Sequence, residues 1–538
     1  MPAWNPRPAA NEYYDVRVAS RRAGSTSPTN PLHRGATYNA IVAHVPLNRI
    51  RSVNGGDVRL DGRYVLYWMI ANRRVTSNFA LQRAVEHARE LQRPLVILEA
   101  LRCDYRWASD RLHRFVIDGM AANARALEGQ PVRYRAYVEP AAGAGRGLLD
   151  ALAQDASVVV TDDFPSFFLP RMVAAAAARI AVRVESVDSN GVLPMRAVAT
   201  PFSTAFSFRA HLQRTLKDEL PHWPADLTFE GLRDPSQAAL DPAIDRRWPE
   251  TPRGDLDEAA SLVSSLPLDH RVGPAWVRGG HVEALATLRR FVLDALPRYA
   301  DDHSQPDVRG TSGLSPYLHF GHISSHEVFA AIMTAERWTS RRIVDRAIAG
   351  APRAGSREGW WGVGPGAEAF LDQLITWREL GYNMCATRPD DYAAYSSLPA
   401  WARATLDAHR TDRRPFRYTR DELDEARTHD HVWNAAQRQL TRDGWMHNYL
   451  RMLWGKKILE WTASPEEALE TMIEIMNRHA LDGRNPNSYS GYCWTLGRYD
   501  RPWAPERDVF GTIRYMSSAN TVKKLRIKNY LEEYGPER

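Results

Sequence analysis

Short apolar runs alternate with helix-type stretches between residues 62 and 187. The run at 64–69 (YVLYWM) contains no charged residue, and continuous apolar runs of this kind are typical of strands buried on both faces. Strands that alternate with helices predict a doubly wound parallel sheet, so the predicted fold class of this part is α/β. The predicted strands are 64–69, 94–98, 132–138, 157–161 and 182–187, and the clearest predicted helices are 80–91 and 111–127.

No glycine-rich dinucleotide motif (GxGxxG) follows the first of these strands. Asp162 and Asp163 stand at the end of the predicted strand 157–161. Carboxylates at this place could line a ligand pocket at the carboxyl edge of the sheet, or serve only the chemistry of a turn. The sequence leaves both interpretations open.

A chain of 538 residues is too long for a single core, which predicts at least two domains. Residues 1–60 are rich in Pro, Arg, Asn and Gly and are predicted to form a poorly ordered arm. We expect an α/β domain at 61–200, a linker rich in Pro and Asp at 201–280, and an all-helical domain at 281–538.

Two smaller features interrupt this plan. The turn signal at 54–56 (NGG) predicts a short hairpin, and the Gly-, Arg- and Trp-rich stretch 352–366 predicts an exposed insertion. The longer helices expected in the last domain are 281–296, 369–387, 433–440 and 446–461.

Charge and cysteine content set limits on the environment of the chain. The formal net charge is +6, a mild excess that permits a polyanionic partner without requiring one. No apolar run approaches the roughly 20 residues of a membrane span, and no signal peptide opens the chain, so we expect a cytoplasmic protein. Cys103, Cys385 and Cys493 are isolated, which predicts neither disulfides nor a metal site.

The predicted helix 446–461 carries an unusual face. His447, Arg451, Trp454, Ile458 and Trp461 are spaced by 4, 3, 4 and 3 residues and therefore share one side. A buried arginine needs a fixed partner, and we expect Asp482 to be that partner. The pair could border a cofactor or could simply be a buried ion pair. Asn448 and Met452 form the neighbouring stripe and could face a ligand.

Tryptophans form a second pattern in the same region. Trp454 and Trp461 lie two helical turns apart, and Trp433 on the preceding helix could bridge them. Such a row is either core packing or an electron path, and its course from a polar cluster to a basic end favours the path. Separately, the hydroxyl-rich stretch 311–315 (TSGLS) precedes a helix, where backbone N–H groups suit a diphosphate.

Four further motifs lie in the second half of the chain, at 311–320, Trp377-Arg378-Glu379-Leu380, 444–452 and 482–487. Through these motifs the chain resembles the photolyase/cryptochrome family. The sequences at 429–435, 456–461 (KKILEW) and 511–516 (GTIRYM) are similar to those of class II cyclobutane pyrimidine dimer photolyases in particular. The resemblance is strong over about residues 296–530, loose over 62–200 and absent from the first 60.

This resemblance implies a helical domain that binds FAD. It implies contacts from Arg378, Arg451 and Asp482 around the isoalloxazine ring, with Asn487 near its N5 atom. The electron path implied is Trp454, Trp433 and Trp461, with Tyr418 as an outer member. The residues implied for the phosphates and ribitol are Tyr299, Thr311, Ser312, Leu314 and Ser315.

The implied activity is light-driven repair of cyclobutane dimers in UV-damaged DNA by a monomer. Trp377 and Trp503 match the walls against which a dimer stacks, and Asn448 and Met452 would line the floor. The α/β domain would hold an antenna pigment, 8-hydroxy-5-deazaflavin or a folate. The residues implied for DNA phosphates are Lys456, Lys457, Arg514, Lys523 and Lys524.

One position departs from the family pattern. Gln373, one helical turn before Trp377, stands where photolyases for cyclobutane dimers usually carry glutamate. Glutamine at this place is found in (6-4) photolyases, which keeps that lesion open as an alternative. A light-sensing cryptochrome without repair activity is the other alternative, since a tryptophan row would serve both.

Overall fold

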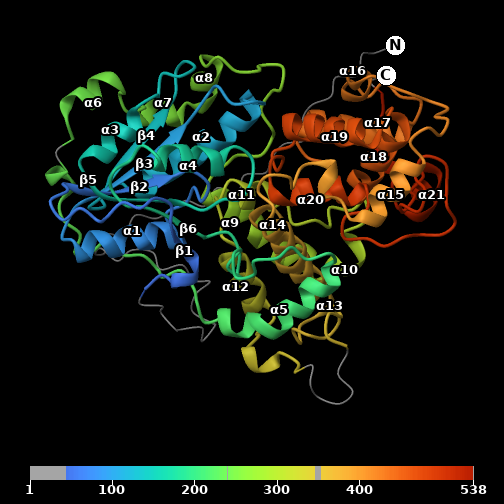
Figure 1. Cartoon of the computed structure of the whole chain (residues 1–538), viewed down its shortest axis with the longest axis horizontal. Coiled ribbons are helices and arrows are strands. Elements are labelled where there is room, and N and C mark those ends of the chain that lie inside the picture. Colours follow the sequence, from blue (N-terminus) through green and yellow to red (C-terminus); the bar gives the residue numbers. More distant parts are fainter. Residues whose placement is uncertain (1–43, 239, 346–352, 537–538) are drawn as a thin grey trace, which may run out of the picture. The chain divides into compact units, whose positions relative to one another are not determined.

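The structure, a computed structural model, describes residues 44–238, 240–345 and 353–536. Its sheet has six strands in the order β1-β6-β5-β2-β3-β4, and only the β1–β6 pair is antiparallel (Figure 1). The parallel α/β sheet predicted from the apolar runs is therefore confirmed. The strands are β1 (Ile50–Ser52), β2 (Tyr64–Met69), β3 (Leu95–Leu101), β4 (Arg133–Val138), β5 (Ala156–Asp162) and β6 (Val184–Val187).

Strand β2 shows why the sheet is covered on both faces. All six of its residues are buried. Tyr64, Leu66 and Trp68 join one apolar core with α3 (Leu148–Gln154) and α4 (Leu169–Ala177). The alternate residues Val65, Tyr67 and Met69 join the core that contains α1 (Phe79–Glu90). Successive side chains of a strand point to opposite faces, so a strand apolar throughout needs helices on both sides. Helix α2 (Asp110–Ala126) packs beside β3 and β4.

The segment before β2 differs from the expectation. Residues 1–43 of the predicted arm lie outside the described residues. Strand β1 pairs with β6, with Arg51 opposite Ser186, so the predicted hairpin at 54–56 is wrong. The Asn54 side chain instead donates to the backbone oxygens of Ile180 and Val182, each at 2.9 Å. An amide that bonds distant backbone in this way ties the segment to the sheet edge.

Among the described residues after β6, every named element is helical (Figure 1). No described helix combines the length and apolarity that crossing a bilayer requires. The α-helices of the predicted linker are α5 (Ala205–Glu219), α6 (Pro242–Arg247), α7 (Arg253–Asp257) and α8 (Ala259–Ser264). Those that follow are α9 (His281–Arg290), α10 (Tyr299–Asp302), α11 (Ser315–His319), α12 (Ser325–Ala335), α13 (Pro365–Leu371), α14 (Arg378–Thr387), α15 (Ala400–Ala408), α16 (Arg420–Asp424), α17 (His431–Asp443), α18 (Asn448–Trp461), α19 (Pro465–His479), α20 (Pro486–Thr495), α21 (Ser518–Lys524) and α22 (Lys528–Glu533).

Two expectations in this helical part need comment. The predicted helix 369–387 is continuous, but a π-helical segment, η7 (Asp372–Trp377), joins α13 to α14. The stretch predicted to be an exposed insertion is exposed at residues 357–359 but not at its tryptophans. Trp360 and Trp361 are buried, and the indole N–H of Trp338 donates to the backbone oxygen of Trp361 at 2.6 Å. Aromatic residues in this stretch therefore belong to the core.

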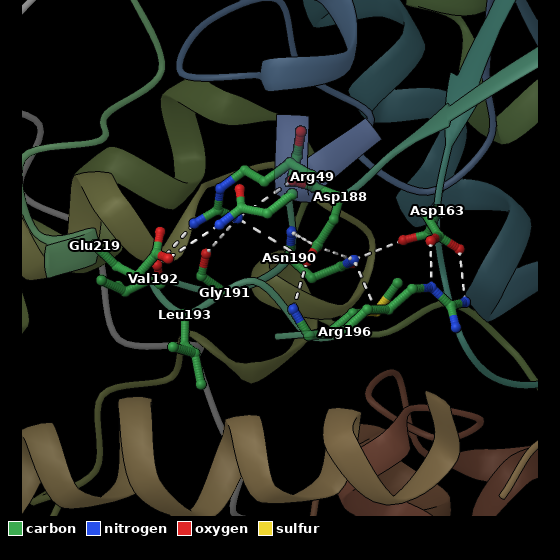
Figure 2. Close-up of polar contacts among 12 residues, drawn as sticks. Arg49, Asp163, Asp188, Asn190, Gly191, Val192, Leu193, Arg196 and Glu219 are labelled. Carbon is green, nitrogen blue, oxygen red and sulfur yellow. Dashed lines mark hydrogen bonds and ion pairs between the residues drawn. The ribbon is translucent and has the colours of Figure 1, made fainter. Parts of the chain in front are cut away.

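The segment after β6 is clamped to the start of α14. The buried guanidinium of Arg49 donates to the backbone oxygens of Gly191 (3.1 Å) and Val192 (2.7 Å), and Figure 2 shows these residues facing one another. From the other side, the carboxylate of Glu379 accepts the N–H groups of Val192 (2.7 Å) and Leu193 (3.0 Å). Burial raises the pKa of Glu379 to about 7. This clamp sets the position of the neighbouring Arg378.

Candidate functional site

Helices α14 and α20 approach each other closely at a glycine. A Cβ atom added at Gly381 would lie 2.6 Å from the side-chain amide of Asn487 and 3.1 Å from Oγ of Ser490. With its amide oriented to donate, Asn487 reaches the backbone oxygens of Arg378 at 2.9 Å and Trp377 at 3.3 Å. The structure therefore brings three of the predicted site residues together.

Helix α18 supplies the predicted ion pair. Arg451 Nη2 lies 3.2 Å from Oδ1 of Asp482, and both side chains are largely buried, with 20% and 13% exposed. Ser488 Oγ donates to the backbone oxygen of Asp482 at 2.8 Å and holds the loop that carries the carboxylate. The buried Nε of Arg451 has no hydrogen-bond partner among the described residues. One donor of a buried guanidinium is thus left for another group.

Arg378 has a different set of partners. Its guanidinium donates to the backbone oxygen of Asn190 at 2.6 Å and to the hydroxyl of Tyr382 at 3.2 Å, and it lies 4.5 Å from the centroid of the Tyr382 ring. These contacts direct its charge toward the segment after β6. No hydrogen bond or ion pair among the described residues joins it to Arg451 or Asp482, so its place beside the same ring stays a prediction.

The hydroxyl-rich segment 311–315 leads into α11, which has only five residues. Ser312 Oγ accepts the N–H of Leu314 at 3.3 Å, and the Leu314 side chain is buried in the core. The ring of Tyr299 is buried and stacks on His303, with centroids 4.8 Å apart. Thr311, Ser312 and Ser315 are half-buried.

The three tryptophans form a continuous buried row. The rings of Trp433 and Trp454 are parallel within 5°, with centroids 6.2 Å apart. Trp433 meets Trp461 edge to face at 5.5 Å, so it lies between the other two as predicted. The ring of Tyr418 follows at 5.3 Å from that of Trp461. The geometry is that of a path; its use for electrons stays a prediction here.

A cavity of about 420 Å³ opens beside this region. Its lining includes Met452 and Trp503, two of the residues predicted to contact a dimer. The Arg514 guanidinium lies 3.9 Å from the centroid of the Trp503 ring. Asp500 fixes the positions of both side chains, because it accepts the indole N–H of Trp503 at 3.0 Å and pairs with Arg514 at 2.8 Å.

The other predicted contacts surround this cavity less directly. Asn448 is exposed at the first residue of α18, one turn before Met452. Gln373 and Trp377 are half-buried on the π-helical segment η7. None of these three residues is part of the cavity lining.

Comparison with curated proteins decides the family. The chain is 33% identical over 487 residues to the deoxyribodipyrimidine photo-lyase of Methanothermobacter thermautotrophicus, a match that covers 90% of this chain and 97% of that protein. The chain belongs to the deoxyribodipyrimidine photolyase family. The photolyase of the same name from Oryza sativa subsp. japonica is 30% identical over 506 residues and is covered to 90%.

The fold has a counterpart among solved structures. A bacterial class III photolyase from Agrobacterium tumefaciens superposes with a TM-score of 0.59 at 18% identity, over 88% of this chain and 87% of that one. At this identity the likeness supports the fold alone. No protein-family model matches the chain.

Two lysines predicted to contact DNA phosphates in this photolyase-family chain are buried. Lys456 is completely inaccessible, and its Nζ donates to the backbone oxygen of Thr495 at 2.6 Å. The prediction that Lys456 contacts a phosphate is therefore wrong. Lys457 is 8% exposed and pairs with Glu460 at 2.7 Å, which also argues against a phosphate contact. Lys523 is exposed and stays a candidate.

The buried amine of Lys456 predicts a pH-dependent stability. Burial lowers its pKa to about 7, whereas an unfolded lysine keeps its proton to about pH 10.4. The unfolded state thus binds more protons between these values, so the free energy of unfolding should rise with pH there, by at most about 1.4 kcal/mol per pH unit. Denaturant unfolding should therefore show the native protein gaining stability relative to Lys456→Met as the pH rises from about 7 to about 9.

The exposed Lys524 offers a matched control for that measurement. Lys524→Met should change the free energy of unfolding by the same amount at every pH, because Lys524 is solvated in both states. A constant difference between the native protein and Lys456→Met from about pH 7 to about pH 9 would contradict the assignment of a neutral amine at Lys456.

The structure adds Trp494, which sequence reasoning missed. Its ring lines the same 420 Å³ cavity, and Arg514 lies 5.8 Å from its centroid. The Nζ atom of Lys456 lies 5.0 Å from the same centroid. The sequence did carry a signal for this residue, because Trp494 lies in the last turn of α20, which begins within the 482–487 motif. Only Trp503 was assigned to the pocket from the sequence.

A second and larger cavity of about 880 Å³ lies at the carboxyl ends of the strands. It is lined by residues that follow β2, β3, β4 and β5, at the point where the strand order reverses between β2 and β5. This is where open α/β sheets bind ligands. Its rim includes Arg484, two residues beyond Asp482. The lining includes six arginines, which are Arg73, Arg102, Arg146, Arg171, Arg179 and Arg484, and three acids, which are Asp104, Glu139 and Asp150.

Asp162 and Asp163 do not line this cavity. The carboxylate of Asp162 is buried and accepts the N–H groups of Ile70, Ala71 and Asn72 at 2.7–3.0 Å. Asp163 pairs with Arg196 at 2.8 Å, a contact visible in Figure 2. Of the two interpretations left open for these carboxylates, turn chemistry is the correct one.

Proposed function

We propose that this protein splits cyclobutane pyrimidine dimers in DNA by light-driven electron transfer from reduced FAD held among its C-terminal helices. One observation carries the proposal beyond family membership. Within a single turn of α18, Arg451 pairs with Asp482, Met452 lines the 420 Å³ cavity and Trp454 begins the indole row. A cofactor site, a substrate site and an electron path would thus share one helix.

The residues present fit a flavin. The unsatisfied Nε of Arg451 is a buried donor beside a carboxylate, and an anionic ring system is the kind of group that such a donor and charge stabilise. Arg451 and Asp482 would border the ring, and Asn487 would add an amide. Thr311, Ser312 and Ser315 would contact the phosphates and ribitol. Bound there in its reduced form, FAD would supply the light-absorbing electron donor.

The side chains of the 420 Å³ cavity would hold the lesion. Photolyases act on nucleotides turned out of the duplex, which is a general property of such enzymes and not inferred from this chain. Trp494 and Trp503 offer two aromatic faces, and base–aromatic stacking contributes roughly 1–3 kcal/mol per base. Arg514 is held by Asp500 at the same wall and adds positive charge toward the DNA backbone.

The 880 Å³ cavity would hold the antenna pigment. Its aromatic lining suits a planar chromophore, and six arginines against three carboxylates favour one that carries negative charge. A deazaflavin with an ionised hydroxyl or a folate would both meet this description. Extraction of the purified protein followed by absorbance spectroscopy would identify the pigment.

Trp454→Phe tests the electron path. Phenylalanine keeps the packing but is much harder to oxidise, so photoreduction of oxidised flavin should slow by at least about tenfold. Repair by chemically reduced enzyme should be unchanged, since it needs no electron from the row. Flash-induced absorbance and a dimer-repair assay measure the two effects separately. Equal photoreduction rates in both proteins would remove Trp454 from the path.

The decisive experiment is illumination of the reduced protein with two DNA substrates. An oligonucleotide with a cyclobutane dimer should be converted to the undamaged oligonucleotide, which chromatography separates from the damaged one. No conversion should occur in the dark. An oligonucleotide with a (6-4) lesion serves as the second substrate because Gln373 departs from the family pattern. Restoration of the (6-4) lesion alone, or of neither lesion, would contradict the proposal.

A further inference from the structure

The buried indole row ends at a phenol and an imidazole that touch. The hydroxyl oxygen of Tyr418 lies 2.5 Å from Nδ1 of His429. The backbone N–H of His429 donates to the same oxygen at 3.0 Å, so the hydroxyl proton is free to point at Nδ1. The rings of Tyr418 and His429 lie 5.3 Å and 5.5 Å from that of Trp461. Both residues are therefore in van der Waals reach of the outermost indole.

The inner indoles lack a comparable base. The indole N–H of Trp433 donates to the backbone oxygen of Trp454 at 3.0 Å, and that of Trp454 donates to the amide oxygen of Gln437 at 2.8 Å. Carbonyl and amide oxygens accept hydrogen bonds but are very weak bases. An oxidised indole at either position would keep its proton. Following the row outward, His429 is the first base in hydrogen-bond contact with an acidic hydrogen.

Other contacts hold the imidazole in place. Phe416 stacks on His429, with centroids 3.8 Å apart and planes inclined by 24°. Asp430 caps α17 by accepting the N–H of Trp433 at 3.1 Å, which fixes the chain next to His429. His429 is exposed, so a proton that it gains can pass to water.

We propose that His429 is the base that takes the proton of Tyr418 when Tyr418, the outer member implied for the electron path, gives an electron to the row. This inference rests on the proposed function. The oxidant is the indole radical cation left on Trp461 when light reduces a bound oxidised flavin. One electron passes from Tyr418 to Trp461, which returns to a neutral indole. The O–H bond of Tyr418 breaks, its proton moves to Nδ1, and the products are a neutral tyrosyl radical and an imidazolium.

The transfer would make charge separation long-lived. Return of the electron to a neutral tyrosyl radical requires a proton as well, and that proton has moved to a residue in contact with solvent. His429 would thus act as a positioning and proton-accepting residue for the outer end of the path.

The test uses flash photolysis of the FAD-loaded protein with optical and spin-resonance detection of radicals. In the native protein an indole radical should give way to a tyrosyl radical. Tyr418→Phe should leave only the indole radical. His429→Gln keeps a hydrogen-bond acceptor that is not a base, so the conversion should slow by at least about tenfold.

A control and a dark measurement complete the design. His270→Gln removes an exposed histidine that pairs with Asp110, far along the chain from the row, and should leave the conversion unchanged. Nitrogen-15 NMR of labelled histidine in the dark protein should show that Nδ1 of His429 carries no proton and accepts the Tyr418 hydroxyl. The chemical shift of this nitrogen should change in Tyr418→Phe. These spectra depend on no repair activity.

The outcomes separate the two proposals. Normal indole radicals with a conversion indifferent to His429→Gln would overturn the role of His429 while leaving the electron path intact. Indole radicals that persist in the native protein would overturn the role of Tyr418. The absence of any indole radical in an illuminated flavin-loaded protein would overturn both the path and the inference that rests on it.

Discussion

Replacing Arg451 with methionine is expected to cost the protein most of its flavin. The substitution removes a guanidinium that pairs with Asp482 at 3.2 Å and leaves the carboxylate 13% exposed and without its charge partner. Breaking a buried pair by removing one member costs on the order of 3 kcal/mol. The same change removes the free Nε that fits an anionic ring. We expect flavin retained after purification to fall at least about tenfold and the melting temperature to fall.

A surface ion pair provides the matched control. Arg410 pairs with Glu466 at 2.7 Å, but the two side chains are 40% and 45% exposed. Arg410→Met should therefore cost less than about 1 kcal/mol and leave flavin content unchanged. The ratio of flavin to protein absorbance and thermal unfolding measure both variants. Full flavin content in Arg451→Met would show that the pair does not border the cofactor.

Removing the aromatic walls of the 420 Å³ cavity should abolish discrimination between damaged and intact DNA. Trp494→Ala and Trp503→Ala each delete one stacking surface, with an expected cost of roughly 1–3 kcal/mol, or about 5- to 150-fold in the dissociation constant for dimer-containing duplex. Affinity for undamaged duplex should change little, because phosphate contacts dominate it. Fluorescence anisotropy with matched damaged and intact duplexes measures the ratio at fixed salt.

Trp276 offers a control of the same residue type. Its side chain is 76% exposed and lies outside the cavity lining, so Trp276→Ala should leave the ratio of the two dissociation constants unchanged. Flavin content should stay normal in all three variants. If Trp494→Ala and Trp503→Ala both bind damaged duplex as well as the native protein does, the cavity is not where the lesion is held.

The sequence predicted those helices and strands whose burial follows from the spacing of neighbouring apolar residues. The continuous apolar run at 64–69 can only be satisfied between two layers of helix, and β2 lies there with every residue buried. The 4-3-4-3 spacing on α18 likewise placed Arg451 and Trp454 on one buried side. In both cases the periodicity of the backbone alone decides which side chains share a face.

Features that depend on distant packing were beyond the sequence. Strand β1 has only three residues and exists because it pairs with β6, more than 130 residues later. Lys456 is buried because α18 and α20 approach closely at Gly455, where an added Cβ would lie 2.5 Å from Cγ2 of Thr495. A pair of lysines in a helix gives no sign of such an approach, so the inward direction of Lys456 was not predictable.

The short loop between α19 and α20 has a consequence for the path of absorbed light. Asp482 belongs to the ion pair of α18, while Arg484, two residues on, borders the cavity at the sheet edge. Two residues of extended chain span only about 7 Å. A pigment in the larger cavity and a flavin beside the ion pair would both border this loop, so excitation passed from one to the other would cross it. The loop is held at its left-handed residue Arg484 (φ 63°), whose backbone N–H donates to the side-chain oxygen of Asn477 at 2.7 Å.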